Sequence, residues 1–122
     1  MCNANLMELA EQARENAYAP YSNFKVGAAV LTSDGTVFTG CNVENTCGTS
    51  CCAERVAIYT AVANGHQNFT SIAVAAEDGT FPCGICRQVI SEFSDNMTVL
   101  IKQGGEIAEY TIQELLPCAF RR

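Results

Sequence analysis

The chain has 122 residues, a formal net charge of −6 at pH 7, and 48% hydrophobic against 16% charged residues. This length and composition exclude a disordered chain and indicate a single globular domain over residues 1–122. Only seven Lys and Arg residues are present, whereas a protein that grips a phosphate backbone usually carries a basic patch. We therefore expect a small, uncharged or cationic substrate and no nucleic acid partner.

We expect neither a membrane-spanning segment nor a secretory signal. No apolar run reaches membrane-spanning length, and Met1–Asn5 lacks a basic region followed by an apolar stretch. Without a signal, the eight cysteines favour metal binding and reduced thiols over a disulfide framework. These features predict a cytoplasmic protein that has no membrane partner.

The first part of the chain predicts a helix and then a hairpin. Apolar residues recur at helical spacing over Leu6–Asn16, and Pro20 is expected to end this helix. The run Lys25–Leu31 predicts a buried strand, and Thr36–Thr39 predicts its return strand. The small residues at positions 27–29 indicate that another element packs closely on the first strand, more often a helix than a ligand.

Helices and strands alternate in the rest of the chain. The predicted elements are a helix over Cys52–Asn64, a strand over Thr70–Ala76, a helix over Cys83–Phe93, strands over Thr98–Ile101 and Ile107–Tyr110, and a short helix that starts in a capping box at Thr111–Glu114. Helices that alternate with strands imply a sheet covered on both faces. The order therefore predicts the α/β class and a three-layer αβα sandwich.

Two motifs carry the strongest chemical signal: Cys-Ala-Glu-Arg at 52–55 and Pro-Cys-Gly-Ile-Cys-Arg-Gln at 82–88. Their thiols suit one zinc ion, because three protein ligands leave the fourth tetrahedral position open for a water. Glu54 can reach that water as a general acid and base without ligating the metal. Both motifs begin predicted helices, where free N–H groups and the helix dipole favour thiolates. The candidate zinc ligands are Cys52, Cys83 and Cys86.

A closed Cys₄ zinc site, in a binding or sensor module, is the alternative from a different class of protein. Cys51 or Cys47 would then be the fourth ligand. Cys51 directly precedes Cys52, and adjacent residues at a helix start point about 100° apart, so they rarely share one tetrahedral ion. A set of buried apolar cysteines is a further alternative, but it leaves Glu54 and Pro82 unexplained.

Polar residues in the loop before the first motif have two interpretations. Asn42 and Glu44 offer donors and acceptors that suit sugar hydroxyls, but their position alone slightly favours turn chemistry and a solvated carboxylate. The motif arginines, Arg55 and Arg87, would balance the negative charge that three thiolates leave on a zinc ion. The alternative for each arginine is a surface ion pair.

The chain resembles the cytidine deaminases of the small, homotetrameric type with a Cys₃ zinc site. The resemblance runs nearly end to end and rests on the segments Tyr18–Ser22, Phe24–Ala29, Gly40–Asn45, Cys52–Arg55, Pro82–Gln88 and Glu114–Pro117. It implies a five-stranded mixed sheet, one zinc ion per subunit and a homotetramer with shared active sites. It also implies hydrolytic deamination of cytidine or 2′-deoxycytidine to uridine or 2′-deoxyuridine plus ammonia, in pyrimidine salvage.

The resemblance also implies roles for single residues. Those that would contact the substrate are Phe24 near the pyrimidine, Asn42 and Glu44 at the ribose, the backbone N–H of Ala53 at the base, and Phe120 as a cap on a neighbouring subunit's pocket. Arg55 and Gln88 would support the zinc thiolates.

One segment departs from the family pattern. Thr46–Cys51 is one residue shorter than usual and lacks the Tyr that is often found there. A shortened loop is also a feature of blasticidin S deaminases, although these relatives usually lack an acidic residue matching Glu44. Because this loop is expected to line the pocket, deamination of a cytosine-nucleoside antibiotic such as blasticidin S stays open as an alternative. The presence of Phe24, Asn42 and Glu44 favours a ribonucleoside or deoxyribonucleoside.

Overall fold

The computed structural model describes residues 1–122 and contains one five-stranded sheet. Its elements, in chain order, are α1 (Asn3–Arg14), β1 (Val26–Thr32), β2 (Val37–Cys41), α2 (Ala53–Ala63), β3 (Phe69–Ala76), the 3₁₀ turn η1 (Glu77–Gly79), α3 (Gly84–Phe93), β4 (Thr98–Gln103), β5 (Glu106–Thr111) and α4 (Ile112–Leu115). The strands lie in the order β2-β1-β3-β4-β5. Only β3 and β4 are parallel, so the sheet is mixed, and the predicted α/β class is confirmed.

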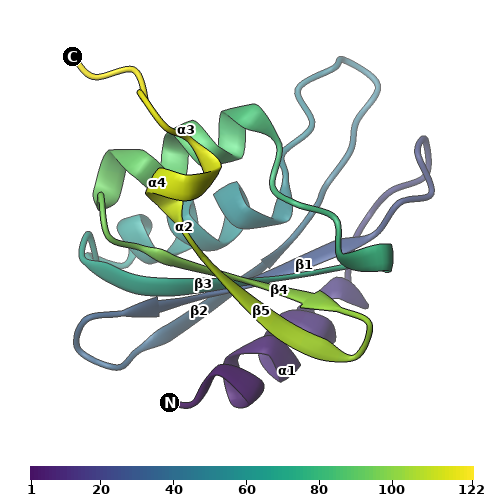
Figure 1. The fold of residues 1–122 in the computed structure, drawn as a ribbon. Helices are drawn as coiled ribbons and strands as arrows, with labels where there is room; N and C mark the ends of the chain where they lie inside the picture. The colour runs from purple at the N-terminus through teal and green to yellow at the C-terminus, as the bar shows by residue number, and fades with distance from the viewer.

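The sheet is the middle of three layers (Figure 1). Successive strand residues point to opposite faces, so each face of the sheet carries apolar side chains that a helix layer covers. On one face Leu6, Met7 and Ala10 of α1 pack against Ala29, Ala73 and Leu100. On the other face α2, α3 and α4 cover a larger core that includes Val30, Ile58, Ile72, Ile90, Val99, Ile101 and Ile112. The αβα sandwich predicted from the order of elements is therefore confirmed.

Two glycines let helices approach the hairpin from opposite sides. A Cβ at Gly27 would lie 2.1 Å from the carbonyl oxygen of Ala10 in α1. A Cβ at Gly40 would lie 2.5 Å from the backbone nitrogen of Ala57 in α2. The expectation that a helix packs closely on the first strand is confirmed, and β1 and β2 are locked between two helices.

The ends of the helices show where local signals succeed and fail. The capping box is present, because Thr111 Oγ1 accepts from Glu114 N at 3.1 Å and Glu114 Oε1 accepts from Thr111 N at 2.8 Å. The expectation that Pro20 ends the first helix is wrong, since α1 ends earlier, at Arg14. There Arg14 Nε donates to the carbonyl of Lys25 at 2.8 Å, and the chain turns to run beside the segment that follows β2.

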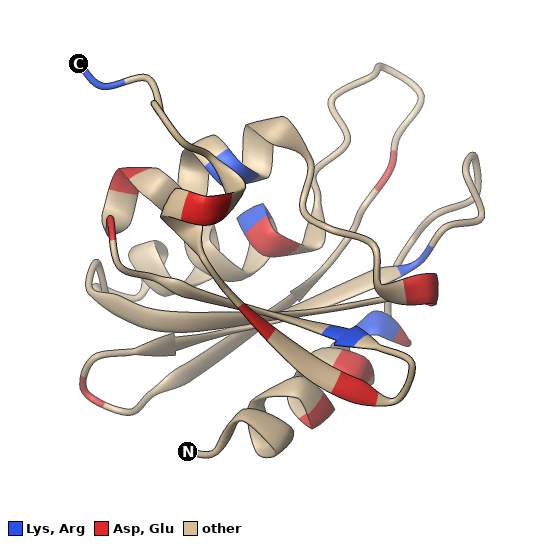
Figure 2. Cartoon of the chain, in the orientation of Figure 1, with Lys and Arg blue, Asp and Glu red and all other residues tan.

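Charged residues are distributed unevenly over the chain. Acidic residues recur on α1 and β5, whereas Lys and Arg are spread along the chain, apart from the adjacent pair Arg121 and Arg122 at the C-terminus (Figure 2). None of the helices combines the length and apolar character that a membrane span requires.

Candidate active site

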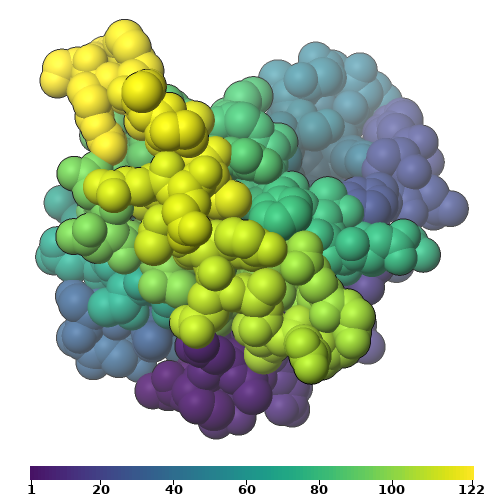
Figure 3. All heavy atoms as spheres, in the orientation of Figure 1, coloured from purple at the N-terminus to yellow at the C-terminus, as the bar shows by residue number.

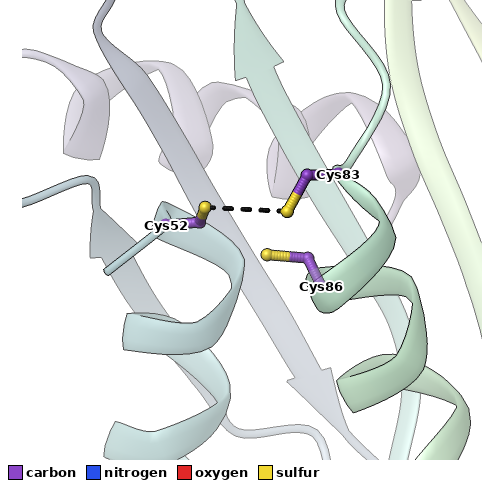
Figure 4. A group of neighbouring side chains, drawn as sticks. All are labelled: Cys52, Cys83 and Cys86. Atoms are coloured by element: carbon purple, nitrogen blue, oxygen red, sulfur yellow. Dashed lines mark hydrogen bonds between the residues drawn. The ribbon is translucent and has the colours of Figure 1, made fainter. Parts of the chain in front are cut away.

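Three cysteines converge where α2 and α3 begin (Figure 4). Cys52 is the N-cap of α2, Cys83 is the N-cap of α3, and Cys86 lies in the first turn of α3. Their sulfur atoms all lie within 4.8 Å of one another, and those of Cys52 and Cys83 are 3.8 Å apart. Tetrahedral zinc with bonds of about 2.3 Å to sulfur separates two ligand sulfurs by about 3.8 Å. The three predicted ligands therefore form a cluster whose chemistry and spacing fit zinc.

The two candidate fourth ligands lie outside this cluster. Cys51 pairs through its backbone with Val43, with N···O distances of 2.9 and 3.0 Å. The thiol of Cys47 bonds within its own loop, to Asn45 Oδ1 and Thr49 Oγ1. The cluster has three members, which is the arrangement of an open site.

Cys52 and Arg55 form the charged centre of the cluster. Arg55 Nη2 donates to Cys52 Sγ at 3.3 Å. A hydrogen bond from Cys86, together with those from Arg55 and Cys83, lowers the pKa of Cys52 to about 5. The pKa of Cys86 is raised, first by its hydrogen bond to Cys52 and then by burial. Arg55 Nε is buried without a hydrogen-bond acceptor. This guanidinium therefore has a donor left for a further thiolate when all three thiols are ionised.

Glu54 is the buried carboxylate of the site. It lies in the first turn of α2, and 4% of its surface is exposed. Burial, together with the charge of the neighbouring Cys52, raises its pKa to about 7. A carboxyl group with a pKa near neutrality can both accept and release a proton at physiological pH.

A cavity of about 230 Å³ opens beside the cluster. Its walls are formed by Ser22, Phe24, Val26, Asn42, Glu44, Cys52, Ala53, Glu54, Val74, Ala76, Thr80, Phe81 and Cys83. The lining combines two thiols and the Glu54 carboxyl with polar loop residues and apolar side chains. The cavity thus gathers five of the predicted substrate and catalytic positions, Phe24, Asn42, Glu44, Ala53 and Glu54, together with the predicted zinc ligands Cys52 and Cys83.

The polar loop residues serve the backbone as well as the cavity. Asn42 Oδ1 accepts from Val26 N and its Nδ2 donates to the carbonyl of Phe24, both at 2.8 Å. Glu44 Oε1 accepts from the backbone N–H groups of Tyr21 at 3.0 Å and Ser22 at 3.1 Å, and its Oε2 accepts from the Ser22 hydroxyl. The Ser22 hydroxyl and these backbone bonds lower the pKa of Glu44. Turn chemistry and a place in the cavity wall therefore occur together.

The structure differs from two expectations about the cavity's surroundings, those for Gln88 and for the loop 46–51, whereas the cap expected of Phe120 concerns a neighbouring subunit's pocket and stays a prediction. Gln88 Nε2 donates to the carbonyl of Phe120 at 2.8 Å and to Ser91 Oγ, and no hydrogen bond joins it to a thiol. The Phe120 side chain is outside the chain's own cavity, with 69% of the residue exposed, and the C-terminal residues project beyond the body of the molecule (Figure 3). The loop 46–51 contributes no lining residue, so the expectation that it lines the pocket is wrong for a single chain.

Sequence reasoning missed several wall residues. Val74 and Ala76 are two residues apart near the end of β3, so they point to the same face of the sheet. Thr80 and Phe81 directly precede the second cysteine motif. The signals that could have identified them are the adjacency of Thr80 and Phe81 to that motif and, for Val74 and Ala76, the alternation along a predicted central strand.

Known proteins are similar to this chain in sequence and structure. Residues 1–102 match the family described as "Cytidine and deoxycytidylate deaminase zinc-binding region". A cytidine deaminase of Sporosarcina psychrophila is 48% identical over 122 residues, covering 96% of this chain and 90% of that protein. A blasticidin-S deaminase of Bacillus cereus is 33% identical over 129 residues, covering 95% and 92%.

The structural comparison agrees with the sequence matches. The crystal structure of a cytidine deaminase from Burkholderia pseudomallei has a TM-score of 0.93 at 46% identity, covering 98% of this chain and all of that one. The cysteine cluster is what a zinc-binding region of this kind requires. The chain therefore belongs to the cytidine and deoxycytidylate deaminase family and carries that family's zinc-binding region.

Proposed function

We propose that the protein deaminates cytidine or 2′-deoxycytidine by hydrolysis, giving uridine or 2′-deoxyuridine and ammonia, as a step in pyrimidine salvage. The observation that carries this proposal is one cavity lined by a buried carboxylate, two thiols of the cysteine cluster and a set of sugar-compatible polar groups. The higher identity to cytidine deaminase than to blasticidin-S deaminase supports the nucleoside over the antibiotic.

Held by Cys52, Cys83 and Cys86, one zinc ion per subunit would supply Lewis-acid activation of a water. Glu54 takes a proton from this water and delivers it to ring N3, which makes C4 more electrophilic. The water oxygen adds to C4. Glu54 then moves the remaining proton of the added hydroxyl to the exocyclic amine, the C4–N bond breaks as the C4 carbonyl forms, and ammonia leaves. A pKa of about 7 suits one carboxylate to both directions of transfer.

The remaining cavity residues bind and orient the nucleoside. Phe24 packs near the pyrimidine, and the backbone N–H of Ala53 meets the base. Asn42 and Glu44 bind the ribose, and Glu44 is suited to this because its lowered pKa keeps it ionised as an acceptor. Arg55 supports the Cys52 thiolate through its 3.3 Å contact.

We also propose that residues 1–122 form a single domain that assembles as a homotetramer with shared active sites. Support comes from Phe120, whose ring is exposed while its backbone is held by Gln88 and its neighbour Arg121 donates to the carbonyl of Ser91 at 2.8 Å. Burying a Phe side chain contributes roughly 1.5–3 kcal/mol, so an anchored but exposed aromatic favours a partner surface.

The decisive experiment for the reaction measures ammonia release from cytidine, 2′-deoxycytidine and blasticidin S side by side. Turnover of the nucleosides is expected. Turnover of blasticidin S alone would replace the proposal with the antibiotic alternative. Absorption spectra of the cobalt-substituted protein separate three thiolate ligands from four, and a four-thiolate spectrum would favour the closed binding or sensor module.

Shared sites are tested by mixing two inactive or weakened subunits. Phe120→Ala subunits are combined with Glu54→Gln subunits, and activity is measured after co-assembly. If Phe120 caps a neighbour's pocket, mixed assemblies exceed the sum of the two parents. Additive activity, or a monomer at micromolar concentration, contradicts the shared site without affecting the zinc chemistry.

A further inference from the structure

The cavity wall nearest the cysteine cluster is an irregular segment. Residues Thr80–Cys83 connect η1 to α3 without helix or strand pairing of their own. Three of these residues, Thr80, Phe81 and Cys83, line the cavity. Backbone N–H and C=O groups outside helices and strands need other hydrogen-bond partners. The shape of this wall therefore depends on which residues bond to the segment.

Arg87, which does not line the cavity, binds this segment. Its Nε donates to the carbonyl of Pro82 at 2.8 Å, and its Nη1 donates to the carbonyl of Leu115, at the end of α4, at 2.9 Å. Its own backbone N–H bonds to the carbonyl of Cys83 at 2.9 Å. One residue of α3 thus ties two consecutive carbonyls of the wall segment and joins the segment to α4.

The same guanidinium lies beside the aromatic ring of the wall. Its central carbon is 6.0 Å from the ring centre of Phe81. Phe81 also meets Tyr110 of β5 edge to face, with centroids 5.0 Å apart at 68°. Phe81 is therefore fixed by Arg87 and Tyr110 while it lines the cavity.

Arg87 has no ion-pair partner and no place in the cavity lining. It takes part in none of the ion pairs of the chain, so the surface ion pair considered for it is absent. It does not line the cavity either. Its side chain's partners are the carbonyls of Pro82 and Leu115 and an aromatic ring, and a planar guanidinium suits them because separate nitrogens donate to the two carbonyls.

We propose that Arg87 is a positioning residue of the deaminase, which acts through Phe81 and Pro82 to set the wall against which the nucleoside binds. The proposal deepens the proposed function and rests on it. Loss of the two charge-assisted bonds would free the wall segment and its ring. The cysteine cluster would still be formed, because Cys83 and Cys86 are also held by α3 itself.

Arg87→Gln and Arg87→Lys test the positioning role. Both should raise KM for cytidine about tenfold, the size expected from losing a hydrogen bond to a charged group, while kcat stays within about threefold and zinc content is unchanged. The Lys variant keeps the charge but loses the paired hydrogen bonds to the Pro82 and Leu115 carbonyls. It is used for the test if the Gln variant does not fold. Lys102→Gln is the charge-matched control, because Lys102 pairs only with Glu11 at 3.2 Å and lies outside the cavity.

A double-mutant cycle shows whether Arg87 acts through Phe81. In a Phe81→Leu background, Arg87→Gln should change KM by less than about twofold, because the ring that it positions is gone. Additive effects on KM would overturn the proposed route. Zinc lost in step with activity would also overturn it, because Arg87 would then hold a metal ligand rather than the wall.

A readout without turnover separates this inference from the proposed function. Amide hydrogen exchange of the peptide containing residues 80–83 should be faster in both Arg87 variants than in wild type and Lys102→Gln. Unchanged exchange overturns the inference even when wild type deaminates cytidine. If wild type and Lys102→Gln both fail to release ammonia from cytidine, the proposed function fails, and the exchange result still decides whether Arg87 positions the wall.

Discussion

The two carboxylates of the cavity have opposite environments. Glu54 lies on a helix, is almost completely buried, and has a pKa raised to about 7 by burial. Glu44 lies on a loop, is half-exposed, and has a pKa lowered first by the Ser22 hydroxyl. A group that must exchange protons needs a pKa near neutrality, whereas one that only accepts hydrogen bonds needs a permanent charge. The contrast assigns chemistry to Glu54 and binding to Glu44.

Removing a cysteine of the cluster should have the largest effect on zinc content and activity. Cys83→Ser and Cys86→Ser are expected to lose zinc and activity together, because each removes one of three thiolate ligands. Cys51→Ser is the matched control, and its zinc stoichiometry and activity should stay close to wild type. Metal content after dialysis and ammonia release check both. Equal loss of metal in Cys51→Ser would show that the open site is wrong.

Glu54→Gln should keep zinc and the fold but lose nearly all turnover. General acid–base groups contribute about 10²–10⁴-fold, and this carboxylate serves every proton transfer of the reaction, so the upper end of that range is expected. The measurement is kcat for cytidine together with zinc content. Turnover within about tenfold of wild type would contradict the mechanism.

The raised pKa of Glu54 also predicts a pH-dependent stability. In the metal-free protein the folded state binds more protons than the unfolded state between the ordinary carboxyl pKa of 4.5 and about 7, so stability falls as pH rises through this window. The difference corresponds to about 3 kcal/mol. Metal-free Glu54→Gln should therefore be more stable than metal-free wild type at pH 8, with little difference at pH 4. Denaturant unfolding at both pH values measures this, and equal stability at pH 8 would argue against a neutral buried Glu54.

Glu44→Gln should have the smallest effect and should act on binding. The amide oxygen can still accept from the Tyr21 and Ser22 backbone, so the loop is kept, but one charged acceptor for the sugar is lost. KM for cytidine should rise about tenfold while kcat changes little. In wild type, 2′,3′-dideoxycytidine should show a similar loss because it lacks the hydroxyls. A fall in kcat with unchanged KM would place Glu44 in the chemistry and remove the contrast between the two carboxylates.

Local patterns determined the elements and the metal cluster of this protein. Hydrophobic periodicity, the Thr111 capping box and the alternation of helices and strands predicted the three-layer fold, because each pattern acts over a few residues. The metal cluster and its carboxylate were predicted for the same reason, from the spacing of Cys52, Glu54, Cys83 and Cys86. Both motifs begin helices, which fix side chains locally.

Long-range packing decided the rest. The end of α1 at Arg14, the walls contributed by Val74, Thr80 and Phe81, and the absence of the 46–51 loop from the cavity depend on partners distant in the chain. The same holds for Arg87, whose motif position gave no sign that it bonds to Leu115 of a helix 28 residues away. Hydrogen bonds between irregular segments leave no periodic trace in a sequence, so only the folded chain shows how the cavity wall is held.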